Sequence, residues 1–401
     1  MASPRAPRWR SPDVLAIALS AFFADFGYQA VLAGFPLFLV LFLHAPVWAY
    51  GLATALSYGG GAVVAYLGGL IGDRTGHRRL ALIGNALIPL LSLSALVPAA
   101  GPAVLLLTLG WWARNLRTPS RRAMLARVVA PEDQGAAFGF LHALDIGGAV
   151  LAALWVLIAV LSHVAWRWVF LATALPLAAS TYALSRTRRL PEPAAEAAAE
   201  APAGAPRAAV GFRSLLLATA LFGFSSYSVG FPILTVAQGL RAPAAGVAAF
   251  LVLQAVSAAT GYIGGPRLGR TLAGRFRNLG LLGYLGAGLA SALLAVGYGL
   301  GLGLVGLLPG IALLGFALAV VETLEPALIT VIRPHGTAGQ GFGALSAARA
   351  TGLFIANLAL GLLYTMGAEY AYGYAALIAC VAALIVFWAL PAVRRAAVAA
   401  A

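Results

Sequence analysis

The stretch GLIGDRTGHRR, residues 69–79, separates two long apolar runs that cover residues 47–71 and 80–98. A helix needs roughly 20 apolar residues to cross a bilayer, so both runs are long enough to span one. The glycines between them allow a tight turn and close helix approach. Asp73, at the end of the first run, can pair with an arginine of a neighbouring helix or cap an adjacent helix N-terminus. The stretch therefore predicts two membrane-spanning helices joined by a short charged loop.

The composition extends this interpretation to the whole chain. Of its 401 residues, 62% are hydrophobic and only 9% are charged, whereas a soluble domain carries about a quarter charged residues. The polar surface is too small to cover a globule in water, so we expect lipid to be the solvent. The formal net charge of +14 does not indicate a nucleic-acid partner, because the arginines lie in short loops between apolar runs.

Apolar runs of spanning length recur along the sequence and predict an all-α membrane protein of twelve transmembrane helices. The first run continues to residue 43 without a small-residue cleavage site, so we interpret it as a span rather than a signal peptide. We expect two six-helix bundles, residues 1–189 and 213–401, joined by a cytoplasmic linker over 190–212. The predicted spans are 13–43, 47–71, 80–98, 102–126, 135–161, 165–185, 213–238, 244–266, 278–298, 303–332, 340–366 and 370–391.

Charge alternates between the loops on the two sides of the membrane. Arginines gather at 74–79, 117–127, 186–189 and 267–277, whereas the intervening loops hold only scattered charges. Because cytoplasmic loops are enriched in arginine, both termini are predicted to be cytoplasmic. We expect a monomeric, multi-pass protein of the cell (inner) membrane, with the lipid bilayer as its surroundings.

An internal repeat relates the two halves. Four landmarks recur in the same order at nearly constant offset, which composition alone does not explain. Such a parallel repeat implies two bundles about a pseudo-two-fold axis along the membrane normal, with a binding site at their interface. The pairs are Gly34-Phe35-Pro36 with Gly230-Phe231-Pro232 and Tyr66 with Tyr262 (230 − 34 = 196), and Phe138-Gly139 with Phe342-Gly343 and Gly148 with Gly352 (352 − 148 = 204).

The loop at 69–79 resembles the signature of the major facilitator superfamily, G-x-L-x-D-R-x-G-R-R. The matching positions include Gly69, Asp73, Arg74, Gly76 and Arg78. The resemblance implies the twelve-helix fold of that superfamily. It also implies that this cluster is a cytoplasmic gate, which locks one state of the transport cycle and loosens in the other. The sequence departs from the signature at two positions, Ile71 and His77.

A second stretch, which begins at Arg117, is similar to the fourth loop of a bacterial branch of the superfamily that includes efflux-type members. In that branch the loop reads I-R-T-x-P-R-D-A. Arg117 and Arg121 match its two arginines, and we assign both to the same gate. Two departures leave proton coupling and direction open. Ala152 and Ala153 stand where antiporters have a Gly-Pro pair, and Leu107 stands where many proton-coupled members have an arginine.

Ionisable residues inside a span are costly and are functional candidates. Asp25 lies near the middle of the first span, with Gln29 one turn later, and is our leading candidate to carry a proton or contact a cation. The alternative is that it only fixes helix packing. Asp145 and Arg349 occupy repeat-related positions. They can form one charge pair or a zwitterion site, or each can pair with a different neighbour.

Glu322 and Glu325 lie one turn apart in the tenth span and are further proton or cation candidates. Alternatively, Glu322 or Glu325 pairs with Arg270 or Arg333 at the cytoplasmic edge. Arg114 and Arg117, in the fourth span, are expected to snorkel or to gate. The residues that we expect to line a central cavity are Tyr28, Tyr58, Tyr227, Gln254 and Asn357.

These features predict a secondary active transporter that moves a small organic or amphipathic solute by alternating access. We expect proton coupling and favour export, from the branch resemblance. A passive facilitator or an uptake symporter are alternatives, and metal-ion export is a minor one. No enzymatic constellation, cofactor motif, nucleotide loop or metal-ligand spacing is present in the sequence.

Overall fold

The chain is helical throughout the part that the structure describes. The computed structural model describes residues 11–129, 133–188, 206–264, 268, 271–332 and 338–398, and these ranges contain no β-strand. Within these ranges, eleven helices are long and apolar enough to cross a membrane. A further helix, α5 (Ala100–Val128), has 29 residues but carries several arginines in its second half. The predicted all-α, twelve-span architecture is confirmed.

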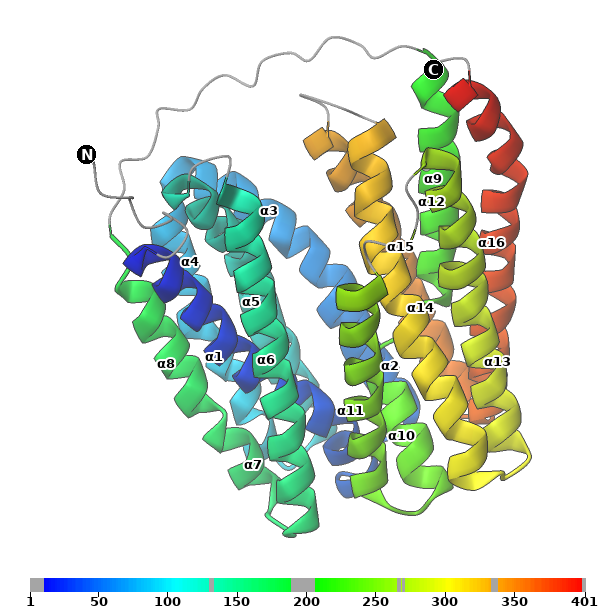
Figure 1. Cartoon of the computed structure of the whole chain (residues 1–401). Coiled ribbons are helices and arrows are strands. Elements are labelled where there is room, and N and C mark those ends of the chain that lie inside the picture. The colour runs from blue at the N-terminus through cyan, green and yellow to red at the C-terminus, as the bar shows by residue number, and fades with distance from the viewer. Residues whose placement is uncertain are drawn as a thin grey trace. The chain divides into compact units, whose positions relative to one another are not determined.

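The first span begins at a well-formed helix cap. The Ser11 side chain accepts a hydrogen bond from the backbone N–H of Val14 at 3.3 Å, and Pro12 opens the first helix with its preset backbone angle. The α-helices of this half are α1 (Pro12–Pro36), α2 (Val47–Ala55), α3 (Gly61–Thr75), α4 (His77–Leu87), α5, α6 (Gln134–Leu161), α7 (Trp166–Ala172) and α8 (Ala174–Ser185). π-Helical turns at Leu37–Phe42 and Leu56–Gly60 and a 3₁₀ segment at Ile88–Leu96 extend the spans (Figure 1).

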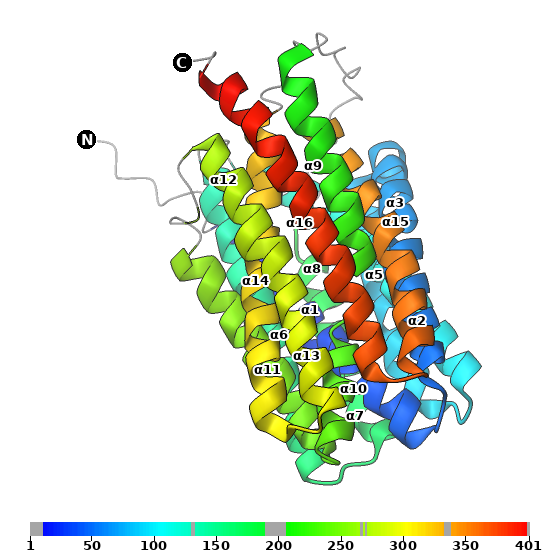
Figure 2. The same cartoon turned by 90° about the vertical axis from the view of Figure 1, so that its right-hand side faces the viewer.

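The second half also contains six spans, in which α9 starts within the predicted linker. Residues 190–205 of that linker lie outside the described part of the chain. Figure 2 shows α16 alongside α9 and α13. The helices are α9 (Pro206–Ser225), α10 (Gly230–Gly239), α11 (Pro243–Ala259), α12 (Leu272–Asn278), α13 (Leu285–Gly299), α14 (Gly303–Ile332), α15 (Ala338–Tyr364) and α16 (Ala368–Val398). π-Helical turns at Thr260–Gly264 and Leu279–Tyr284 extend two of these spans.

By packing, the chain forms two compact units. One comprises Met1–Ala45 and Leu56–Glu196, and the other comprises Pro46–Ala55 and Ala197–Ala401. Helix α2 therefore packs with the second unit, where it lies against α15. A Cβ atom on Gly51 would lie only 2.7 Å from the Cα of Gly361, so the two backbones meet at glycines. The predicted domains, 1–189, 190–212 and 213–401, differ from these packing units in the placement of α2, and they stay a prediction.

Each unit has its own apolar core. In the first unit the core joins α1 to α5, α6 and α8 through buried side chains such as Ile17, Leu125 and Leu184. In the second unit it joins α9 to α13, α14 and α16. Because lipid is as apolar as these side chains, close packing rather than exclusion of water holds the helices together.

The charged loop at 69–79 forms the tight turn that its glycines predict. Gly76 has φ +100°, a conformation that side chains with a Cβ rarely adopt, and it joins α3 to α4. Asp73 pairs with His77 at 3.2 Å, instead of with an arginine of a neighbouring helix. Arg78 donates to the backbone oxygens of Ser185 at 2.7 Å and Thr187 at 3.1 Å, and so caps the C-terminal end of α8.

Repeat-related glycines bring equivalent helices together in both units. In the first unit, a Cβ on Gly148 of α6 would lie 2.3 Å from the backbone oxygen of Phe22 in α1. In the second, a Cβ on Gly352 of α15 would lie 2.7 Å from the backbone oxygen of Ala220 in α9. The repeat noted in the sequence therefore marks matching close contacts between helices.

We expect Gly148→Ala to destabilise the protein, because the added methyl meets backbone that cannot move aside. Overpacking of this kind costs about 1–3 kcal/mol. Gly147→Ala is the matched control, since its Cβ would lie 3.6 Å from the nearest atom, a Phe22 ring carbon. The melting temperature of the purified protein in detergent measures the stability of both variants. Equal melting temperatures for the two variants would contradict this account of the α1–α6 contact.

Candidate functional site

Asp25 is buried within the first unit. Its side chain lies on α1 and is only 5% exposed. The phenol of Tyr28 donates a hydrogen bond to Oδ1, whereas Oδ2 has no hydrogen-bond partner among the described residues. A Cβ on Gly148 would lie 3.1 Å from the Cβ of Asp25, so the glycine contact of α6 also covers this carboxylate. No cation of the described chain lies within 4.0 Å of it.

Arg114 approaches this carboxylate indirectly, through the same tyrosine. Its Nη2 lies 3.5 Å from the Tyr28 oxygen. Its guanidinium carbon lies 4.9 Å from the Trp111 ring centroid and 5.3 Å from that of Tyr28, within the range of cation–π attraction. Tyr58 packs edge-on against Trp111 at 5.2 Å. Two predicted cavity residues, Tyr28 and Tyr58, therefore belong to one cluster with Asp25.

Arg117 does not snorkel, so this part of the prediction is wrong. Its side chain is fully buried, and Nη1 donates to Oδ1 of Asn85 at 2.8 Å. The amide of Asn85 in turn donates to Ser180 at 3.0 Å, which fixes α4 and α5 to α8. Nε and Nη2 of Arg117 have no hydrogen-bond partner in the described part of the chain.

Asp145 and Arg349 pair with different neighbours, which was the second of our two expectations. Asp145 on α6 lies 3.6 Å from Arg121 on α5, within the first unit. Arg349 on α15 pairs with Glu325 on α14, within the second. Arg270 and Arg333, the partners that we considered as an alternative for Glu325, lie outside the described residues.

Among the described residues, Glu325 is the second buried carboxylate. It is 1% exposed and bonds Arg349 through Oε2, while Tyr284 donates to Oε1 at 2.7 Å. Thr219 on α9 joins the network at 3.1 Å from the Tyr284 oxygen. Glu322, one turn away on α14, is exposed. The structure thus separates two glutamates that the sequence leaves equivalent.

The seventh span is interrupted at mid-length. Helix α9 ends at Ser225 and α10 begins at Gly230, although the two belong to one predicted span. The predicted cavity residue Asn357 supports the interruption, since its Oδ1 accepts from the backbone N–H of Ser228 at 3.0 Å. Ser228 Oγ also lies 2.7 Å from the Tyr50 oxygen.

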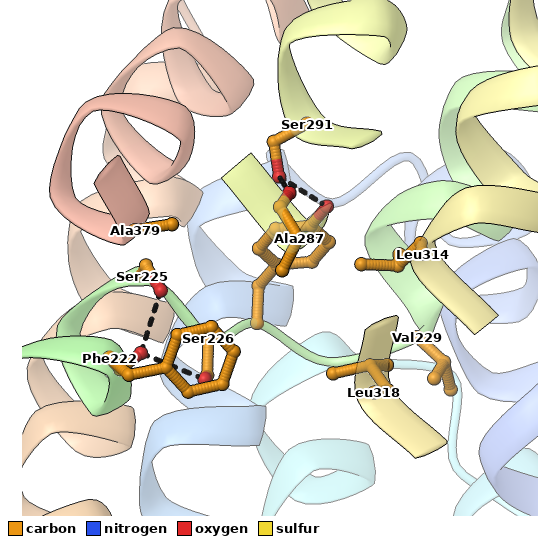
Figure 3. Close-up of a pocket in the computed structure, with 10 residues that line it drawn as sticks. Phe222, Ser225, Ser226, Val229, Ala287, Ser291, Leu314, Leu318 and Ala379 are labelled. Atoms are coloured by element: carbon orange, nitrogen blue, oxygen red, sulfur yellow. Dashed lines mark hydrogen bonds between the residues drawn. The ribbon is translucent and has the colours of Figure 1, made fainter. Parts of the chain in front are cut away.

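A small cavity of about 20 Å³ lies beside this interruption (Figure 3). Its polar lining includes Ser225, Ser226 and the predicted residue Tyr227, together with Ser291 of α13. The Tyr227 and Ser291 oxygens lie 3.0 Å apart. Gln29, predicted to act with Asp25, and Gln254, predicted to line a central cavity, are half-buried and form no hydrogen bond with the described residues. The described residues contain no group of three His, Cys, Asp or Glu side chains that could hold a metal ion.

Sequence reasoning missed several members of these clusters. Tyr284, Trp111 and Ser291 carry no signal in the sequence that separates them from packing residues. The interruption between α9 and α10, in contrast, does carry a signal in the sequence. Polar residues at 225–228 precede Gly-Phe-Pro, and Pro232 has no N–H to donate to the Ser228 carbonyl.

The sequence matches the profile of the Major Facilitator Superfamily over residues 17–356, and the chain belongs to this superfamily. It is therefore a multi-pass membrane transporter rather than an enzyme. The predicted fold of two six-helix bundles is that of the superfamily. A comparison with curated protein sequences gives no match.

Solved transporter structures share this fold at low sequence identity. A POT family transporter in complex with a thioalcohol-conjugated peptide gives a TM-score of 0.77 at 13% identity, covering 95% of this chain and 96% of that one. A D-xylose–proton symporter gives 0.75 at 15%, covering 94% and 97%. The nucleoside transporter NupG gives 0.71 at 15%, covering 94% and 98%.

We expect Arg349→Ala to destabilise the protein strongly, because it leaves Glu325 buried without its cation. Removing one partner of a buried pair costs about 3–5 kcal/mol. Adding Glu325→Gln to this variant removes the unpaired charge and is expected to restore part of the loss. Thermal unfolding in detergent measures both, with Glu322→Ala as the exposed control on α14. A melting temperature for Arg349→Ala equal to that of the control would show that the pair contributes little.

Proposed function

We propose that the protein is a proton-coupled secondary transporter that moves a small organic solute by alternating access. The observation that carries the proposal is that each unit buries one carboxylate held by a tyrosine phenol, Asp25 by Tyr28 and Glu325 by Tyr284. A carboxylate inside a membrane span is costly, and it is therefore a functional candidate. Protonation changes the cost of burying it and can bias the equilibrium between two conformations.

Asp25 is the leading proton carrier in this proposal. It can gain or lose a proton without breaking an ion pair, because no described cation lies within 4.0 Å. Its neighbour Gln29 can contact the solute or the proton path. Glu325 differs, since its protonation would release Arg349. Asp145, paired with Arg121 and 25% exposed, is a secondary candidate.

The solutes of structurally similar transporters support the proposal. One is a D-xylose–proton symporter, and others transport peptides or nucleosides, all small organic solutes. We place the protein in the inner membrane as a monomer with both termini cytoplasmic, from its arginine distribution. Export is the direction that we favour, from the branch resemblance, and uptake symport is the alternative. In this proposal the loop of Gly69, Asp73, Arg74, Gly76 and Arg78, with Arg117 and Arg121, forms the cytoplasmic gate.

The test begins with a thermal-shift screen of small organic solutes on purified protein, which identifies a compound that binds. Flux of that compound into proteoliposomes is then measured with and without an imposed pH gradient. The proposal predicts that the gradient accelerates flux in the wild type and has no effect in Asp25→Asn.

Glu322→Gln is the matched control, since this carboxylate is exposed and should leave gradient dependence intact. A wild-type flux that ignores the gradient, together with full activity in Asp25→Asn, would identify a passive facilitator instead.

A further inference from the structure

The interruption between α9 and α10 is built into the second unit rather than being a packing defect. Non-helical backbone at membrane depth is tolerated where it is buried in protein or lines a cavity. Here, Asn357 and Tyr50 hold Ser228, by contacts of 3.0 Å and 2.7 Å respectively. The backbone N–H of Ser226 still bonds to the oxygen of Gly223 at 3.1 Å. The break is therefore fixed on both sides, and its neighbouring hydroxyls have defined positions.

The hydroxyl hydrogens that line the cavity are already used. Ser225 and Ser226 both donate to the backbone oxygen of Phe222, at 2.7 and 2.9 Å, and Ser291 donates to that of Ala287 at 2.9 Å (Figure 3). Because the Ser291 hydrogen is used, Tyr227 must be the donor in its 3.0 Å contact with Ser291. The lone pairs of these oxygens remain available, so the cavity offers acceptors.

The cavity also lacks charge. None of its ten lining residues has a carboxylate, an imidazole or a cationic side chain. An ion bound there would have no counter-charge in contact, and desolvating an ion without one is costly. A neutral molecule with hydroxyl or amide donors meets the oxygen acceptors, while Phe222 and Leu314 provide apolar contact.

From these observations we infer that the cavity is the solute subsite of the second unit, and that it takes an uncharged solute group that donates hydrogen bonds, such as a hydroxyl or an amide. The inference rests on the proposed transport function and narrows its substrate class. An anionic group would face oxygen lone pairs, and a cationic group would find no carboxylate in the lining.

One wall of this subsite connects it to the buried acid. The Phe222 ring, which lines the cavity, stacks on Tyr284 with centroids 4.4 Å apart and planes inclined by 16°. Tyr284 donates to Glu325 at 2.7 Å. A solute that displaced Phe222 would therefore change the packing of the phenol that holds Glu325. Tyr284 is a positioning residue in this arrangement, since it does not line the cavity.

The single native cysteine, Cys380, makes a thiol-labelling test possible without knowledge of the natural solute. In a Cys380→Ala background, Ser225→Cys and Ser291→Cys each place one thiol in the cavity. Three methanethiosulfonate reagents carry a neutral hydroxyethyl, a cationic trimethylammonium-ethyl or an anionic sulfonatoethyl group. Each rate is divided by that reagent's rate with Arg241→Cys, an exposed loop position.

The hydroxyethyl reagent is expected to label both cavity thiols roughly tenfold or more faster than either charged reagent, because the charged groups must be desolvated without a partner. Charged reagents that react as fast as the neutral one would overturn the inference. So would failure of both cavity thiols to react while Arg241→Cys is labelled.

Protection experiments then test for binding. D-xylose, uridine and a panel of other neutral sugars, nucleosides and amides are compared with their phosphorylated, carboxylated and aminated counterparts. Neutral members are expected to slow labelling of Ser291→Cys. Equal protection by charged members, or protection by none, would contradict the inference. Labelling uses detergent-solubilised protein without a pH gradient. The result for the subsite is therefore independent of the result for proton coupling, and either proposal can be contradicted without the other.

Discussion

The constraint on which this structure depends is that a carboxylate inside the hydrocarbon must be held by partners within its own helix bundle. Water is not available there, and an unsatisfied charge is costly. In the first unit a phenol on the same helix holds Asp25, and Arg114 lies beyond that phenol. In the second unit an arginine and a phenol from two other helices hold Glu325. Because these partners are internal to each unit, each bundle can keep the contacts of its buried acid through a conformational change.

Glycine packing puts these partners in place. Gly148 brings α6 against α1 at the level of Asp25, and the repeat-related Gly352 brings α15 against α9. Arg349, one turn before Gly352 on α15, thereby faces the region of α9 and α14 where Glu325 lies. The same backbone contact therefore serves two different charge arrangements. The units share the packing and differ in the chemistry that it supports.

The units also differ at the repeated Gly-Phe-Pro. In the first, α1 runs without a break to Pro36. In the second, four polar residues precede the repeat and the helix is interrupted from Ser226 to Val229. Only the second unit thus has a hydroxyl-lined cavity at its broken span, as far as the described residues show. In our proposal the two units have separate roles, with proton transfer at Asp25 in the first unit and the solute subsite in the second.

The sequence predicts the spans well, because hydropathy depends on composition over about 20 residues and not on tertiary contacts. It also identifies Gly148 and Gly352, whose equivalence is visible as a repeat. It does not predict which acid pairs with which base, because pairing depends on how each helix is rotated about its axis. Glu325 and Glu322 lie one turn apart, yet one is buried and the other is exposed. Tyr284 and Ser291 join the clusters only through contacts between distant segments.

The central claim is that protons move with the solute through a buried carboxylate. It is tested most directly by recording the pH inside proteoliposomes with a trapped dye while the solute found by the screen enters, with no gradient imposed. The account predicts that solute entry changes the internal pH, with acidification for symport and alkalinisation for antiport, and that this change disappears in Asp25→Asn. Solute entry in the wild type without any change in internal pH would contradict it.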